Sequence, residues 1–161
     1  MACAAPAQQP HELPADLQPC ARPAFISPVP VPADHVVVVL QARSEFSGIT
    51  KLSGFCLVVD GKLVNPESPD AGLRDLKGGV DFPFAVRAGT DHSVDVVVTM
   101  TGTGNAEGYR FQVRSKHAFT AKSSGSIDVT LTELGTDRTP VEQRPTIVWT
   151  EKFAARSDGG V

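Results

Sequence analysis

Hydrophobic and polar residues alternate along much of the chain after residue 34. The clearest example is the segment 93–100, SVDVVVTM, in which every second residue is valine or methionine. Similar alternation is centred on Phe82, Phe84, Val86, Tyr109, Phe111, Val113, Ile127, Val129, Leu131, Ile147 and Trp149. A period of two is typical of a β-strand with one buried face, so each of these segments is predicted to be a strand, with 93–100 in the middle of a sheet.

Other features refine the strand assignment. The run 35–42, HVVVVLQA, is apolar without alternation, which predicts a strand covered on both faces or one whose outer face tolerates valine. Asp60-Gly61 stands between the runs FCLVV and KLV, and it predicts a hairpin because both turn residues need positive φ. Pro83 cannot donate to a ladder, so its strand is predicted to lie at an edge. The segment 65–79 interrupts the pattern and is interpreted as a loop or as one helical turn.

These segments add up to seven or eight short strands, and no helical period longer than two turns accompanies them. This pattern favours an all-β fold, an antiparallel two-sheet β-sandwich, over residues 34–155. A closed barrel is the main alternative architecture. Neither architecture specifies a function by itself.

The first part of the chain has a different composition. Eight of the 13 prolines lie in the first 32 residues, and this density opposes both helix propagation and sheet ladders. Residues 1–33 are therefore predicted to be a disordered, proline-rich leader, whose PVPVP stretch at 28–32 is a stiff, extended spacer. Residues 156–161 are predicted to be a disordered tail.

Charge and hydropathy exclude two classes of partner. The formal net charge is −3 and the 15 basic residues are scattered, so the basic footprint that nucleic-acid binding needs is missing. The apolar run at 36–40 is far shorter than the roughly 20 residues of a membrane-spanning helix. The first 20 residues lack the basic and apolar regions of a secretory signal, so the protein is expected to be cytosolic or to have had its signal removed from this sequence.

Two short motifs carry a family resemblance. The turn at 88–92, AGTDH, leads into the alternating valine strand, and it resembles the immunoglobulin-like or transthyretin-like domains of bacterial envelope proteins. Cys3, followed by a small and proline-punctuated stretch, resembles the start of a mature bacterial lipoprotein, with Met1 added for expression. The resemblance implies a non-enzymatic binding or scaffolding module in the periplasm or at the outer membrane, held to the membrane only by a lipid on Cys3. An ordinary cysteine in a flexible terminus is the alternative interpretation of Cys3.

Three cysteines leave one unpaired in any disulfide count. If Cys3 carries the lipid, Cys20 and Cys56 are free to pair in an oxidising compartment, and the bond would tie the leader to the sandwich. The alternative is that Cys56, which lies in an apolar run, is simply a small core residue.

No catalytic, metal or cofactor site is predicted. The histidines, His11, His35, His92 and His117, form no close pair of zinc-ligand spacing. His92 and Ser93 are neighbours on a strand and therefore point to opposite faces, which opposes proton transfer between them. The nucleophile elbow G-x-S-x-G is absent. A carbohydrate-binding domain or a hydrolase is the least favoured hypothesis, since Trp149 and Tyr109 are both assigned to the core.

A protein partner is expected at two charged or glycine-rich loops, because ordered loops often carry recognition. The candidate contact residues are Asn105 and Glu107 in the loop 101–108, and Arg138, Glu142 and Arg144 in the loop 137–145. The alternative function is a cytosolic interaction partner tethered to a larger assembly. In that hypothesis the valine-rich run 36–40 is an exposed edge that adds to a partner's sheet. The oligomeric state stays open.

Overall fold

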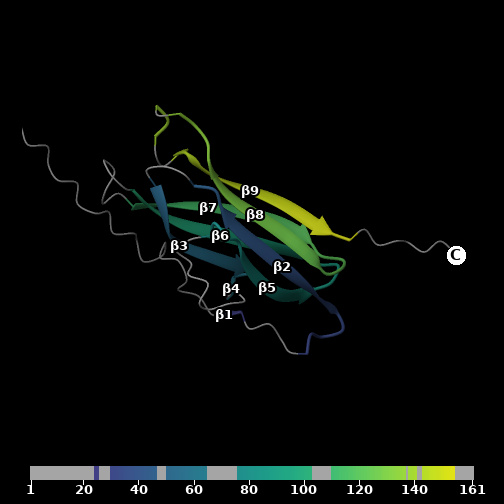
Figure 1. Cartoon of the computed structure of the whole chain (residues 1–161). Helices are drawn as coiled ribbons and strands as arrows, with labels where there is room; N and C mark the ends of the chain where they lie inside the picture. The colour runs from purple at the N-terminus through teal and green to yellow at the C-terminus, as the bar shows by residue number, and fades with distance from the viewer. Residues whose placement is uncertain are drawn as a thin grey trace, which may run out of the picture.

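The computed structural model describes residues 24–25, 30–46, 50–64, 76–102, 110–136, 138–140 and 143–154. Within these ranges the regular secondary structure consists of β-strands (Figure 1). In chain order they are β1 (Ala24–Phe25), β2 (His35–Ser44), β3 (Thr50–Val59), β4 (Lys62–Val64), β5 (Val80–Arg87), β6 (Asp91–Gly102), β7 (Arg110–Thr120), β8 (Gly125–Glu133) and β9 (Pro145–Phe153).

The strands form two sheets that lie one over the other (Figure 1). One sheet has the order β1-β4-β3-β6-β7, and the other has the order β5-β2-β8-β9. The predicted all-β, two-sheet sandwich is confirmed. Two pairings differ from a uniformly antiparallel arrangement, because β1 runs parallel to β4 and β2 runs parallel to β8.

Several strand positions agree with the sequence pattern. β6 contains the alternating valines and lies between β3 and β7, in the middle of its sheet. β5 contains Pro83 and is an edge strand that pairs with β2 alone. The missing N–H of Pro83 therefore removes no hydrogen bond to a strand on its other side. The Asp60-Gly61 hairpin is confirmed by φ values of 47° and 80°, which place both residues in the left-handed region that a tight two-residue turn requires.

The apolar run 36–40 belongs to β2, which lies between β5 and β8. From Val38 onward β2 pairs with a strand on each side, so its backbone hydrogen-bonding groups are taken up within the sheet. The hypothesis that 36–40 is an exposed edge for a partner is therefore wrong. The run lacks alternation because Val37 and Val39 on the outer face are half-buried. This agrees with the interpretation of a strand whose outer face tolerates valine.

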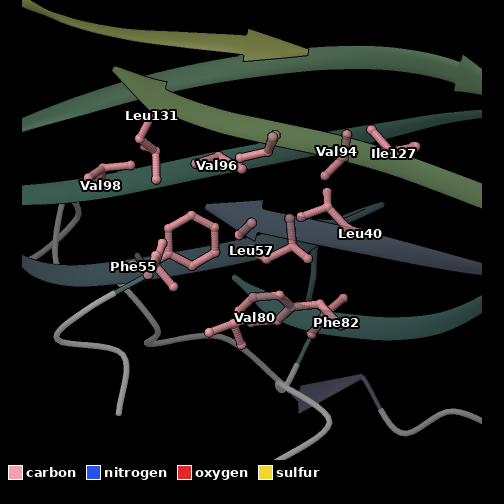
Figure 2. Close-up of a cluster of buried hydrophobic side chains, with 14 of the residues drawn as sticks. Leu40, Phe55, Leu57, Val80, Phe82, Val94, Val96, Val98, Ile127 and Leu131 are labelled. Carbon is pink, nitrogen blue, oxygen red and sulfur yellow. The ribbon is translucent and has the colours of Figure 1, made fainter. Parts of the chain in front are cut away.

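The facing sides of the two sheets form the core (Figure 2). Val94, Val96 and Val98 line β6 and meet side chains of β2, β5 and β8 from the other sheet. Phe55 of β3 and Phe82 of β5 join the sheets with ring centroids 5.4 Å apart. Each fully buried side chain of this size contributes about 1.5–3 kcal/mol through removal from water, so this layer supplies most of the stability.

β1 lies inside the predicted leader and pairs with β4 at the edge of the five-stranded sheet, with Ala24 opposite Leu63 and Phe25 opposite Val64. The chain therefore contacts the sandwich ten residues before β2 begins. The rest of the leader, apart from residues 30–33, lies outside the described residues, as do the tail and most of the segment 65–79.

Gly125 allows β8 and β9 to approach closely. A Cβ atom there would lie 2.6 Å from the Lys152 carbonyl oxygen and 3.1 Å from the Phe153 Cα, whereas at Gly78 no atom lies within 4 Å. We expect Gly125→Ala to lower the free energy of unfolding by about 1–3 kcal/mol, because backbone must move to admit the methyl group. Gly78→Ala, the matched control, should leave it within about 1 kcal/mol of the wild type. Urea unfolding measures both, and equal effects would contradict the β8–β9 register.

Candidate functional site

The most distinctive cluster of polar side chains lies where the edge strands of the two sheets meet. Ser115 and His117 of β7 pair with Val96 and Val94 of β6, which both belong to the core. Since paired residues of an antiparallel ladder share a face, Ser115 and His117 point toward the second sheet. The sequence pattern contained a signal for this, because both residues continue the inward period of Phe111 and Val113.

Two residues of β9 face them from the other sheet. Trp149 and Glu151 pair with Val129 and Ile127 of β8, and those two side chains are fully buried in the core. Trp149 itself packs against the core and is partly buried. The prediction that Trp149 lies on a core face is confirmed, whereas Tyr109 lies outside the described residues.

These four residues, Ser115, His117, Trp149 and Glu151, are called the β7–β9 junction below. The indole Nε1 of Trp149 donates to Ser115 Oγ at 2.8 Å. The His117 ring stacks on the indole with centroids 5.0 Å apart and an interplanar angle of 12°. His117 Nε2 and Glu151 Oε1 lie 2.7 Å apart. Every member of the junction therefore contacts a residue from the opposite sheet.

The junction contains a serine, a histidine and a carboxylate, which are the residue types of a hydrolytic triad, but their bonding is different. A triad needs the histidine to accept the proton of the serine hydroxyl. Here His117 Nε2 is bonded to the carboxylate, and Ser115 Oγ accepts from the indole. The bonds of the junction join the two sheets where the sandwich would otherwise be open.

A second polar cluster surrounds His92, whose side chain is only 8% exposed. Its Nδ1 lies 2.7 Å from Asp60 Oδ2, and its Nε2 lies 2.9 Å from the Arg87 carbonyl oxygen. The other carboxylate oxygen of Asp60 accepts the backbone N–H of Ser93 at 2.9 Å. His92 thus links the β3–β4 hairpin to the turn between β5 and β6. Ser93 contributes its backbone N–H to this cluster, not its hydroxyl group.

His35 is occupied by a local contact at the start of the sandwich. Its Nδ1 lies 2.7 Å from Asp34 Oδ1, and Arg87 Nε approaches the same carboxylate at 3.3 Å. The hydrogen bond from His35 is the main reason that the pKa of Asp34 lies below its usual value of 3.8. Across the described ranges, no three histidine, cysteine or acidic side chains gather in a way that would hold a metal ion.

The predicted partner-binding residues fall into three groups. Asn105, Glu107 and Glu142 lie outside the described residues. Arg138 is exposed at the tip of the loop between β8 and β9. Arg144 is half-buried and its Nε donates to the Thr139 carbonyl oxygen at 2.9 Å, so it holds the loop in shape.

The described residues of the loop between β8 and β9 form hydrogen bonds with one another. The Leu134 N–H donates to the Arg144 carbonyl at 2.8 Å, and the Thr136 N–H donates to Thr139 Oγ1 at 3.1 Å. Leu134 is 60% exposed at the end of β8. Leu134 follows Glu133 and lies out of phase with the inward residues of β8. An apolar residue at this outward position breaks the alternation, and that break could have identified the exposed leucine from the sequence.

Cys56 lies on β3 and is disulfide-bonded. Its neighbours Phe55 and Leu57 belong to the core between the sheets, so Cys56 points to the opposite face of the five-stranded sheet. The two other cysteines of the chain, Cys3 and Cys20, lie outside the described residues. The pairing of Cys20 with Cys56 therefore stays a prediction.

A scan against models of protein families finds no match for this chain, and a search of curated proteins finds none either. The part of the chain that the structure describes contains no helix long and apolar enough to cross a membrane.

The Ser115–Trp149 hydrogen bond can be measured by a double-mutant cycle. We expect Ser115→Ala and Trp149→Phe to show a coupling energy of about 1 kcal/mol in urea unfolding, because each variant removes the same inter-sheet bond. Ser115→Ala combined with Val148→Ala is the control. Val148 is exposed on the other face of β9, and this pair should be additive within about 0.5 kcal/mol. Additivity of the first pair would show that the bond does not join the sheets.

Proposed function

We propose that this protein is a non-enzymatic binding or scaffolding module of the bacterial cell envelope, anchored through a lipid on Cys3. The observation that carries the proposal is the disulfide at Cys56. Disulfides persist in oxidising compartments and are rare in the cytosol, where thiols are kept reduced. An exported protein is the context in which this bond is stable, and the resemblance of the Cys3 region to a mature lipoprotein fits that context.

The bonding of the polar clusters supports a role without catalysis. Ser115 and His117 are engaged by Trp149 and Glu151 across the sheets. His92 is engaged by Asp60 and by the Arg87 carbonyl. In these contacts no histidine accepts the proton of a serine hydroxyl, as a hydrolytic triad requires, and each contact joins separate elements of the sandwich.

The proposed binding surface is the loop between β8 and β9, with a protein as partner. Leu134 provides an exposed apolar side chain and Arg138 an exposed charge. Hydrogen bonds hold the described residues 134, 136, 139 and 144 in place before binding, so these residues lose less ordering entropy on association. We propose that Asn105, Glu107 and Glu142 also contact the partner.

The lipid proposed for Cys3 has a physical requirement. One acyl chain gives only marginal membrane binding, so stable anchoring needs a diacylated cysteine or a second signal. No Lys or Arg precedes Arg22, so a basic patch does not supply that second signal within the first 21 residues. The anchor is therefore proposed to be a cysteine carrying more than one acyl chain.

The proposal is tested by expressing the natural gene, with its upstream coding region, in a bacterium grown with labelled palmitate. We expect the protein in the membrane fraction, labelled by palmitate, with Cys56 protected from alkylation until a reductant is added. Cys3→Ala should release the protein from the membrane and abolish the label.

Cys20→Ala is the matched control for the lipid and should keep the palmitate label. Recovery of the wild type as an unlabelled cytosolic protein with Cys56 as a free thiol would overturn the proposal and favour the cytosolic alternative.

A further inference from the structure

The outer face of the five-stranded sheet is buried, although the other sheet packs on the opposite side. Cys56 and Val58 of β3 and Val97 and Thr99 of β6 alternate with core residues and so point outward. They are only 2%, 4%, 5% and 1% exposed. Among the described strands, none lies over this face, since both sheets contribute their other sides to the core. The described strands therefore do not account for the burial of this face.

A buried polar side chain on the same face also indicates that another segment of the chain covers it. Gln112 of β7 pairs with Thr99 and shares its face, and its Nε2 donates to Thr99 Oγ1 at 3.3 Å. Its Oε1 is buried and has no hydrogen-bond donor within the described ranges. A buried acceptor of this kind costs free energy unless a donor reaches it, so the covering segment is expected to bring one.

The disulfide identifies which segment lies there. Cys56 is disulfide-bonded, and the chain has only two other cysteines, Cys3 and Cys20. Both belong to the segment 1–23, before β1. The segments 65–75 and 103–109 contain no cysteine, so neither of them can supply the second sulfur atom.

The position of β1 favours Cys20 over Cys3. Ala24 lies beside Leu63, and Leu63 lies beside Val58, so strand spacing places Ala24 about 10 Å from Val58 and about 12 Å from Cys56. Cys20 precedes Ala24 by four residues, which span up to about 14 Å. A disulfide joins Cα atoms about 5.5 Å apart, so Cys20 reaches Cys56 with several ångströms to spare, and its short loop costs less closure entropy than the longer one from Cys3.

We propose that Cys20 forms the disulfide with Cys56 and that this bond fastens the segment 1–23 over the outer face of the five-stranded sheet. The bond forms by thiol–disulfide exchange. The two thiols lose two protons and two electrons, which reduce the disulfide of an exported oxidoreductase to two thiols. Cys3 takes no part in this bond and stays available for a lipid, a point that rests on the proposed function.

Peptide mapping of the unreduced wild-type protein tests the inference directly. Cleavage after glutamate separates the three cysteines, because Glu12, Glu45 and Glu67 place Cys3 in 1–12, Cys20 in 13–45 and Cys56 in 46–67. We expect 13–45 joined to 46–67, and 1–12 free. A link between 1–12 and 46–67, or three free cysteines, would overturn the inference.

The same map separates this inference from the proposed anchor. A link through Cys3 would overturn both, because that thiol could not then carry a lipid. A link through Cys20 in a protein without palmitate label would leave the inference standing and remove the anchor.

Matched variants test whether the bond holds the cover in place. In Cys20→Ser we expect Cys56 to be alkylated by a maleimide under native conditions and the urea midpoint to fall. Cys3→Ser should keep Cys56 unreactive and leave the midpoint unchanged. If both variants left Cys56 unreactive, the cover would be held by other contacts and the fastening role of the disulfide would be wrong.

Discussion

The burial of alternate side chains between two stacked sheets is the constraint on which the rest of the structure depends. Val94, Val96 and Val98 of β6 pack against β2 and β8 from the other sheet. Because side chains alternate along a strand, fixing these three residues inward also fixes which residues point outward. The positions of Ser115 and His117 inside the junction, and of Cys56 on the outer face, follow from this choice of register.

The two sheets are joined by different kinds of contact at the centre of the sandwich and at the β7–β9 junction. Between the sheets the contacts are apolar, whereas at the β7–β9 junction they are two hydrogen bonds and a stacked ring pair. A polar junction suits an edge that is partly open to water, since a purely apolar one would leave exposed hydrophobic surface. The groups that resemble catalytic residues therefore join the two sheets at this edge.

The sequence predicted the parts of the fold that depend on local periodicity. The alternating strand β6, the Asp60-Gly61 turn and the edge position of Pro83 are all encoded within a few residues. The position of β2 was harder, because a run of valines is consistent with a central strand and with an exposed one, and only its neighbours β5 and β8 decide. The pair His117 and Glu151 is separated by 34 residues, so its existence depends on topology that local patterns do not contain. The disulfide state of Cys56 depends in the same way on a distant cysteine.

Hydrogen exchange of the backbone amides, measured strand by strand, tests the central claim about burial most directly. If the facing sides of β2 and β6 form the centre of the molecule, their amides should exchange most slowly, at rates set by global unfolding, and those of the edge strands β5, β7 and β9 should exchange faster. Rapid exchange in β2, at the rate of the edge strands, would contradict the sheet order and with it the assignment of every inward and outward side chain.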